Sequence, residues 1–157
     1  MILCLVGTSP YSFKRLVKEV DRIADKYKIF IQIGNTKYIP QNCKYIDFEE
    51  KDKLLERISK AELIITQGGY GSMMDAIQLN KKIIAIPREE EYKELIGNQS
   101  ELVKYFESKN YVLGCYDIVD LEELVDVCLK DKIEFKKYQA ESTIKISDKI
   151  DEYIQNV

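Results

Sequence analysis

The sequence predicts an α/β fold in which a mostly parallel β-sheet is covered by helices on both faces. Three observations support this prediction. Short apolar runs of strand length alternate with segments of helical periodicity from one end of the chain to the other. Such alternation favours βαβ units, whose right-handed crossovers place parallel strands in one sheet. No internal repeat, low-complexity tract or proline- and glycine-rich linker interrupts the pattern.

Six strands are expected, and the apolar runs that mark them are of the type found in a buried parallel sheet. They cover residues 2–7, 28–34, 43–48, 62–67, 82–87 and 111–116. The first ends at Gly7, the second at Gly34 and the fifth at Pro87, and glycine and proline commonly end a strand.

The helices between these strands are marked by apolar residues that recur three and four positions apart. In the first helix, this spacing joins the residues Phe13, Leu16, Val17, Val20, Ile23 and Ala24. Further helices are expected over residues 54–61, 72–80, 102–106 and 121–129. A last helix, over about residues 141–157, is expected to pack on the sheet of its own chain through a narrow apolar stripe. The stripe consists of Ile146, Ile150, Tyr153, Ile154 and Val157.

The composition is that of one soluble globular domain spanning residues 1–157. Hydrophobic residues make up 45% of the chain and charged residues 32%, which is ordinary for a folded protein. The formal net charge of -3 gives no electrostatic reason to expect a nucleic-acid partner. The apolar N-terminus lacks a basic start and stops at Gly7. We therefore expect a first strand there, rather than a signal peptide or a membrane span, and a cytoplasmic protein.

The residues that most often bind metals or transfer protons are sparse. Cys4, Cys43, Cys115 and Cys128 lie far apart and form no CxxC pair, so no zinc site is expected. The apolar contexts of Cys4, Cys115 and Cys128 predict reduced packing residues. The chain contains no histidine, which is the commonest general base in enzymes.

The ends of the strands indicate where a ligand binds. In a doubly wound parallel sheet, ligands lie at the carboxyl ends of the strands, near the point where the strand order reverses. The strand ends of this chain are Gly7-Thr8, Gly34-Asn35, Phe48, residues 67–72 and Pro87-Arg88. These segments are expected to meet at one edge of the sheet.

The most informative strand end is the stretch LIITQGGYGSMMDA, residues 63–76. Gly68, Gly69 and Gly71 allow the backbone to approach a ligand and to adopt positive φ. Ser72 and Asp75 match an S-x-x-D capping box, which places a helix start at Ser72. Because a helix N-terminus carries a partial positive charge, it favours a phosphate. A tight, well-capped turn with no ligand is the alternative. The stretch matches neither a Walker A loop nor a dinucleotide fingerprint.

Two charged residues near these strand ends have alternative roles. Asp75 either completes the capping box or accepts hydrogen bonds from ribose hydroxyls. Arg88 either binds a phosphate or carboxylate, or forms a surface salt bridge with one of Glu89, Glu90 and Glu91. The sequence alone leaves both alternatives open.

Four separated stretches together resemble a known family. They are VGTSPYSFKRLVKEVD (residues 6–21), FIQIGNTKYIP (30–40), ITQGGYGSMMDAI (65–77) and IIAIPREEEYKELIGNQSELVKYF (83–106). In this order and spacing they are similar to small glycosyltransferase family 28 C-terminal-domain proteins. Members of this family are soluble donor-binding subunits of two-part transferases in bacterial exopolysaccharide or capsule assembly. A eukaryotic counterpart is the soluble subunit of the transferase that adds N-acetylglucosamine to a dolichol-linked sugar.

The resemblance implies one Rossmann-like domain, equivalent to the C-terminal half of a GT-B glycosyltransferase. It also implies an inverting transfer from a UDP-sugar, with no cofactor or bound metal, to a lipid-linked acceptor. A separate membrane-associated subunit would bring that acceptor, and the chain would be active as a hexosyltransferase only with this partner. The chain would then be peripheral to the inner face of the membrane. The last helix would be a candidate docking surface for the partner.

The resemblance also assigns roles to individual residues. Donor-binding residues would be Gly7, Thr8, Gln67, Gly68, Gly69, Gly71, Ser72, Asp75, Arg88, Asn98 and Gln99. Within this set the glycine-rich turn would hold the diphosphate and Asp75 the ribose, and the backbone near Phe48 is a candidate contact for uracil. Glu94 and Gln99 would face the sugar.

The chain departs from the family at the positions that would supply an imidazole. Many relatives carry histidine in place of Gln67, and a His-Gln pair in place of Asn98 and Gln99. A general base must still deprotonate the acceptor hydroxyl, and either the partner or Glu94 would supply it. A non-catalytic subunit that only stabilises its partner is the alternative function. A sugar-nucleotide epimerase is disfavoured because such enzymes carry two such halves in one chain.

Overall fold

A computed structural model of the chain describes residues 1–95, 97–139 and 150. Its centre is one six-stranded sheet in the order β3-β2-β1-β4-β5-β6, and every neighbouring pair of strands is parallel. All six expected strands are present, each within the predicted range. Their bounds are β1 (Ile2–Leu5), β2 (Ile29–Gln32), β3 (Lys44–Ile46), β4 (Leu63–Gln67), β5 (Lys82–Ile86) and β6 (Leu113–Gly114).

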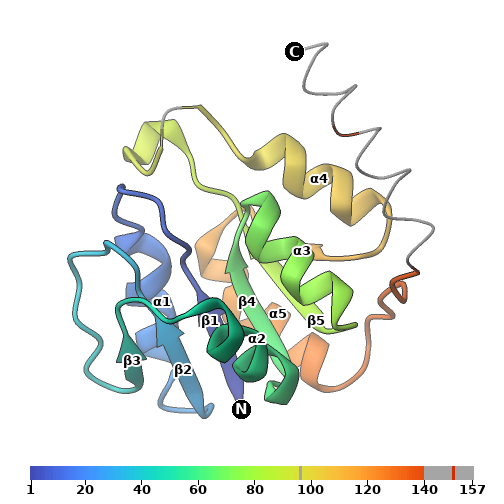
Figure 1. Ribbon diagram of the computed structural model, residues 1–157, viewed down its shortest axis with the longest axis horizontal. Helices are drawn as coiled ribbons and strands as arrows, with labels where there is room; N and C mark the ends of the chain where they lie inside the picture. The colour runs from blue at the N-terminus through green and yellow to red at the C-terminus, as the bar shows by residue number, and fades with distance from the viewer. Residues whose placement is uncertain (96, 140–149, 151–157) are drawn as a thin grey trace.

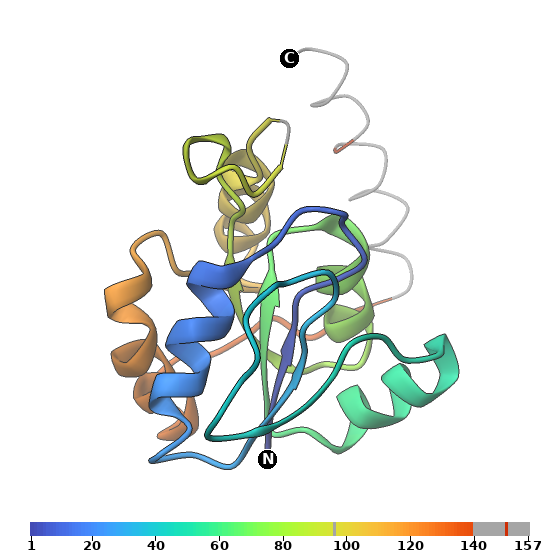
Figure 2. The same ribbon diagram turned by 90° about the vertical axis from the view of Figure 1, so that its left-hand side faces the viewer.

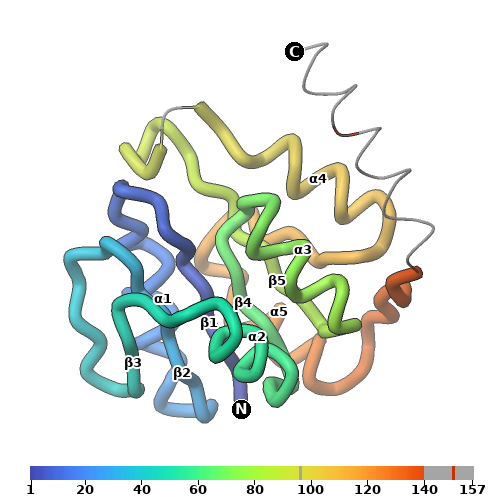
Figure 3. The backbone as a smooth tube through the Cα atoms, viewed as in Figure 1, coloured from blue at the N-terminus to red at the C-terminus, as the bar shows by residue number. Residues whose placement is uncertain are grey.

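The strand order reverses at β1. From β1 the chain builds outward through β2 to β3, and it then crosses back to place β4 on the other side of β1 (Figure 1). Figure 3 shows β2 and β3 on one side of β1, and β4 and β5 on the other. Because all strands point the same way, the loops that follow β1 and β4 leave the sheet at the same edge. A ligand is expected at this edge in a doubly wound sheet.

Helices cover both faces of the sheet, as predicted. They are α1 (Lys14–Ile23), α2 (Lys51–Lys60), α3 (Tyr70–Gln78), α4 (Ser100–Ser108) and α5 (Leu121–Leu129). Apolar residues of α1 and α5 form one buried cluster with alternate residues of the strands, and those of α2, α3 and α4 form a second. Figure 2, which views the sheet nearly edge-on, shows α1 and α5 on one side of it and α2 and α3 on the other. Two short 3₁₀ turns, Glu90–Tyr92 and Ile118–Asp120, were not among the predicted elements.

The start of α3 differs from the prediction. The helix begins at Tyr70, two residues before the expected start, and its N-cap is the extended residue Gly69, with φ -82° and ψ 145°. No side chain caps the helix, so the proposed capping box of Ser72 and Asp75 is wrong. The expectation of positive φ in this turn is also wrong, because the glycines with positive φ are at other positions, Gly7 among them. A glycine N-cap leaves the first amides of the helix without a side-chain partner from within the chain.

The predicted C-terminal helix over about residues 141–157 lies outside the described residues, apart from Ile150. That residue is helical and 5% exposed, and it belongs to the cluster formed with α2, α3 and α4. The prediction of one domain over residues 1–157 stays a prediction. Among the described residues, none of the helices has the length and apolar character to cross a membrane.

Candidate functional site

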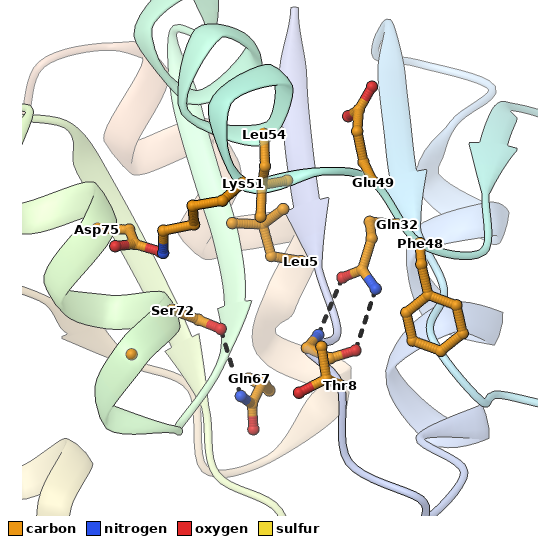
Figure 4. Close-up of a pocket in the computed structure, with 12 residues that line it drawn as sticks. Leu5, Thr8, Gln32, Phe48, Glu49, Lys51, Leu54, Gln67, Ser72 and Asp75 are labelled. Carbon is orange, nitrogen blue, oxygen red and sulfur yellow. Dashed lines mark hydrogen bonds and ion pairs between the residues drawn. The ribbon is translucent and has the colours of Figure 1, made fainter.

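A cleft of about 430 Å³ lies at the carboxyl edge of the sheet, over the point where the strand order reverses. Its walls come from the ends of β1, β2 and β4, the loop after β3, and the first turns of α2 and α3 (Figure 4). The lining residues are Leu5, Gly7, Thr8, Gln32, Phe48, Glu49, Lys51, Leu54, Gln67, Gly71, Ser72 and Asp75. The position of the cleft is therefore the one that the strand ends in the sequence predicted.

The amide of Gln32 fixes two walls of this cleft. Its Oε1 accepts hydrogen bonds from the backbone N–H groups of Val6 (3.1 Å) and Gly7 (3.0 Å). Its Nε2 donates to the carbonyls of Gly7 and Asp47, both at 3.0 Å. The side chain thus ties the end of β1 to the segment after β3, and Gly7 turns there with φ +84°. Sequence analysis did not single out Gln32, although a glutamine within an otherwise apolar strand was an available signal.

The glycine-rich turn combines a packed position with an open one. A Cβ atom on Gly68 would lie 2.6 Å from Val103 Cγ2 and 3.1 Å from the Cα atom of Pro87, so this glycine is required for packing. A Cβ atom on Gly71 would have no neighbour within 4 Å, because this glycine faces the cleft. The amides of the first turn of α3, which includes Gly71 and Ser72, precede the intrahelical hydrogen-bond ladder. The cleft therefore offers backbone donors at a helix N-terminus, which suits an anion.

Behind the turn, two glutamines and an arginine form a network. Gln67 Oε1 accepts from Gln99 Nε2 (2.9 Å) and from Arg88 Nε (3.3 Å), and Gln67 Nε2 donates to Ser72 Oγ at 3.4 Å. Gln99 Oε1 in turn accepts from the backbone N–H of Arg88 at 3.0 Å. This network joins the turn after β4 to the segment between β5 and α4.

Arg88 is buried, at 1% exposure, and does not line the cleft. Its guanidinium donates to the carbonyls of Val6, Tyr11 and Glu94 at 2.9 to 3.0 Å, and it lies 4.7 Å from the ring centroid of Phe13. The alternative of a surface salt bridge to the following glutamates is therefore wrong. Burial lowers the pKa of Arg88 to about 10, an effect that the charge of Glu94 partly offsets. Arg88 therefore joins the three chain segments that contain Val6, Tyr11 and Glu94.

Glu94 is also buried, and its carboxylate is engaged. Arg15 donates to Glu94 Oε1 from Nε and to Oε2 from Nη2, and the backbone N–H of Glu89 donates to Oε2 at 3.0 Å. Burial disfavours the charged form of Arg15, but the hydrogen bond and the charge of Glu94 outweigh this effect. The pKa of Arg15 consequently lies above its ordinary value. Glu94 does not line the cleft.

Two carboxylates do line the cleft, and each has a basic partner. Asp75, on the second turn of α3, forms an ion pair with Lys51 at the start of α2. Glu49 pairs with Arg57, whose guanidinium lies 4.0 Å from the ring centroid of Phe30. The partner of Asp75 is therefore a side chain across the cleft and not its own helix backbone.

The structure brings about half of the predicted site residues to the cleft. Gly7, Thr8, Gln67, Gly71, Ser72 and Asp75 line it, as does Phe48, near which the backbone is the candidate for the uracil contact. Gly68, Gly69, Arg88, Glu94, Asn98 and Gln99 do not line it. Of these, the exposed Asn98 accepts a hydrogen bond at Oδ1 from the backbone N–H of Ser100, at the start of α4. Sequence analysis also missed four lining residues, because only the folded chain brings them to the cleft. They are Leu5, Glu49, Lys51 and Leu54.

Comparison with known proteins points to one family. The family model of the glycosyltransferase family 28 C-terminal domain matches residues 1–156. The chain is 32% identical over 85 residues to the UDP-N-acetylglucosamine transferase subunit ALG13 of Candida albicans. It is 27% identical over 93 residues to the protein of the same name in Homo sapiens. These alignments cover 54% and 56% of this chain, but 28% and 8% of the two relatives.

Solved structures share the fold. The NMR structure of ALG13 superposes with a TM-score of 0.62 at 16% identity, and the match covers 92% of each chain. MurG of Acinetobacter baumannii superposes with a TM-score of 0.56 at 15% identity, over 80% of this chain and 40% of MurG. The expected Rossmann-like fold, equivalent to the C-terminal half of a GT-B glycosyltransferase, is confirmed.

Proposed function

Because this chain belongs to the glycosyltransferase family 28 C-terminal domain family, we propose that it is the donor-binding catalytic subunit of an inverting glycosyltransferase. It moves a sugar from a UDP-sugar to a lipid-linked acceptor, as a hexosyltransferase of exopolysaccharide or capsule assembly. A separate membrane-associated subunit holds the acceptor, and this chain is cytoplasmic and peripheral to the membrane through that partner. The names of the curated relatives, which describe subunits of a UDP-N-acetylglucosamine transferase, support a divided enzyme.

One observation carries the proposal. The cleft at the strand-order reversal combines the N-terminus of α3, an open backbone at Gly71, and a carboxylate at Asp75 about one helical turn further on. This arrangement suits a nucleoside diphosphate, with its phosphates at the helix N-terminus and its ribose hydroxyls on Asp75. The ring of Phe48, 46% exposed on the facing wall, is available to the base.

The same geometry provides a means of catalysis. As UDP leaves, negative charge grows on its β-phosphate, and preorganised N–H donors at the start of α3 stabilise this charge where it forms. No metal ion takes part in this proposal. The acceptor must also be held in line with the sugar, and a second lobe over the cleft does this. The chain alone therefore binds the donor, while transfer requires the partner.

We assign the general base to the partner subunit. The chain has no histidine, and the carboxylates of Asp75 and Glu49 in the cleft are paired with basic residues. The bidentate contact between Arg15 and Glu94 supports a positioning role for Glu94 rather than that of a base. Both carboxylate oxygens of Glu94 accept hydrogen bonds from groups of its own chain, and the residue does not line the cleft.

Titration of UDP into the purified chain tests the binding half of the proposal. We expect saturable binding by calorimetry, together with amide chemical-shift changes at Gly7, Gly71 and Ser72. A second hollow at the opposite edge of the sheet, which includes Lys82 and Phe135, serves as an internal control because its amides should not respond. Neither heat nor shift changes at millimolar UDP, or shifts confined to that second hollow, would contradict the proposal.

A non-catalytic, partner-stabilising subunit is the second candidate function. The paired carboxylates and the missing imidazole favour it, because no described group of the cleft is free to accept the proton. Reconstitution with the partner distinguishes the two functions. If Gly71→Val and Asp75→Ala leave transferase activity unchanged while both variants still bind the partner, the chain is non-catalytic. Loss of activity at unchanged partner binding supports the donor-binding role.

A further inference from the structure

The cleft contains a lysine whose ammonium group is held by a carboxylate on the opposite wall. Lys51 is the first residue of α2, and its Nζ contacts Asp75 Oδ2 on α3. Figure 4 shows the Lys51 side chain extended across the cleft toward Asp75. Among the described residues that line the cleft, Lys51 is the one with a positive charge. Its side chain is 60% exposed, whereas that of Asp75 is 18% exposed.

The charge balance of the cleft depends on this lysine. The negative charge of Glu49, whose side chain is 7% exposed, is matched by Arg57, a residue that does not line the cleft. Asp75 and Lys51 match each other within the cleft. A diphosphate adds negative charge next to Asp75, and like charges at close range repel each other. A cation that moves toward the phosphates would offset this repulsion and would add to the attraction of the helix N-terminus.

The ammonium group of Lys51 is within reach of such a phosphate. Ser72, in the first turn of α3, precedes Asp75 by three residues, a rise of about 4.5 Å along the helix axis. The lysine stem is flexible and has four carbons, and most of this side chain is in solvent. A small rotation of the stem therefore takes the ammonium from the Asp75 carboxylate to an anion at the N-terminus of α3.

We propose that Lys51 is a further donor-binding residue that changes partner when a nucleoside diphosphate binds. Without nucleotide its ammonium pairs with Asp75, and with nucleotide it pairs with the phosphates. The ribose hydroxyls then replace Lys51 as hydrogen-bond donors to Asp75, so both charged side chains keep a partner. This inference rests on the proposed function, because it takes the phosphates to lie at the N-terminus of α3. It makes Lys51 the residue that distinguishes the diphosphate from the nucleoside.

The test compares UDP with uridine in binding to the full chain and its variants. Lys51→Met should weaken UDP binding by about three-fold to five-fold, the upper part of the range for one exposed ion pair, and should change uridine binding by less than about two-fold. Lys51→Arg should restore UDP binding, because it retains the charge. Lys53→Met is the matched control: it lies on the same helix and removes the same charge, but it does not line the cleft. Raised salt should reduce the effect of Lys51→Met on UDP.

Several results would overturn the inference. Wild-type UDP affinity in Lys51→Met would show that the lysine makes no phosphate contact, and tighter binding would show that it obstructs the cleft. Equal losses for UDP and uridine would show that it acts only through Asp75 on the ribose. Amide spectra of each variant establish that the fold is intact, which a substitution at an exposed lysine should preserve. If the wild-type chain binds neither ligand, the proposed function fails and this inference fails with it; an unchanged Lys51→Met beside a binding wild type overturns the inference alone.

Discussion

Arg15 on α1 donates two parallel hydrogen bonds, 2.9 Å and 3.0 Å long, to the two carboxylate oxygens of Glu94 in the segment after β5. Glu94 is 3% exposed, and the side chain of Arg15 is 17% exposed. Because removing one partner leaves the other charge poorly solvated, Glu94→Gln should destabilise the fold. We expect a loss of about 2–3 kcal/mol, below the full range for a buried pair because Arg15 keeps some contact with water. Urea unfolding followed by circular dichroism measures this loss.

The matched control for this prediction is Glu56→Gln. Glu56 pairs with Lys60 one turn along α2, and both side chains are more than half exposed. Its removal should change the free energy of unfolding by less than about 0.5 kcal/mol. If Glu94→Gln instead unfolds like the wild type and abolishes transfer in the reconstituted pair, then Glu94 is the general base and its positioning role is wrong.

Gly68 and Gly71 should respond in opposite ways to the same substitution. Gly68→Ala forces a methyl group against Val103 and Pro87, so it should destabilise the protein by about 1–3 kcal/mol. Gly71→Ala meets no neighbour within 4 Å and lies in the first turn of α3, so stability should be unchanged or slightly increased. Its methyl group enters the cleft, however, and should weaken UDP binding by about ten-fold.

Thermal unfolding and UDP titration of the two variants separate packing from ligand contact, and each variant is the control for the other. A Gly71→Ala variant that binds UDP as tightly as the wild type would place the diphosphate away from the start of α3. A Gly68→Ala variant of wild-type stability would show that helix α4, which carries Val103, moves to make room.

The sequence predicts the sheet and the edge that carries the cleft, because these depend on local patterns. Each strand is an apolar run, and parallel strands bring their carboxyl ends to one edge. The start of α3 could not be predicted in the same way. Ser72 and Asp75 match a capping box, but the helix begins at Tyr70 after an extended Gly69, so Ser72 lies inside the first turn.

The roles of single side chains required contacts between distant segments. Arg88 donates to the carbonyl of Val6, 82 residues earlier in the chain, and no pattern around Pro87 and Arg88 indicates this contact. Lys51 was missed because only the placement of α2 beside α3 brings it to Asp75. The fold thus determines which of the strand-end residues line the cleft and which lie behind it.

Asp75→Asn should weaken the binding of uridine by about five-fold, because the proposed partner of this carboxylate is the ribose. The binding of UDP should weaken by less, because the substitution also removes a negative charge next to the diphosphate and releases Lys51. Stability should change by less than about 0.5 kcal/mol, since Asp75 does not cap α3 and its partner Lys51 is exposed. Calorimetric titration with both ligands measures the effect, and Asp25→Asn, at an exposed residue outside the cleft, is the control. If Asp75→Asn binds uridine as tightly as the wild type, the carboxylate does not contact the ribose and its role is the ion pair with Lys51.

Gln32→Glu should make the protein less stable, and the loss of stability should increase as pH rises. The amide nitrogen of Gln32 donates to two carbonyls, those of Gly7 and Asp47, and the residue is 4% exposed. An ionised carboxylate at this position would face both carbonyls without a donor, which should destabilise the fold by about 2–4 kcal/mol at neutral pH. Burial and these carbonyls favour the protonated form of the introduced carboxyl, whereas the N–H groups of Val6 and Gly7 favour its ionised form. We expect burial and the carbonyls to outweigh the N–H groups, so the pKa in the folded protein should lie above its unfolded value of about 4.3.

At pH values between the unfolded pKa and the raised folded pKa, the folded variant should bind more protons than the unfolded chain. The free energy of unfolding should therefore fall as pH rises through this range. Urea unfolding at pH 5 and at pH 7.5 measures the loss in the free energy of unfolding relative to the wild type. This loss should be smaller at pH 5, where the protonated carboxyl can still donate one hydrogen bond. Gln78→Glu, at the exposed end of α3, is the control and should show the same small effect at both values. A loss of stability of equal size at pH 5 and pH 7.5 for Gln32→Glu would mean that the carbonyls of Gly7 and Asp47 turn away from the introduced group.

UDP binding to Gln32→Glu should weaken together with stability, because Gln32 also holds the amide of Gly7 at the cleft.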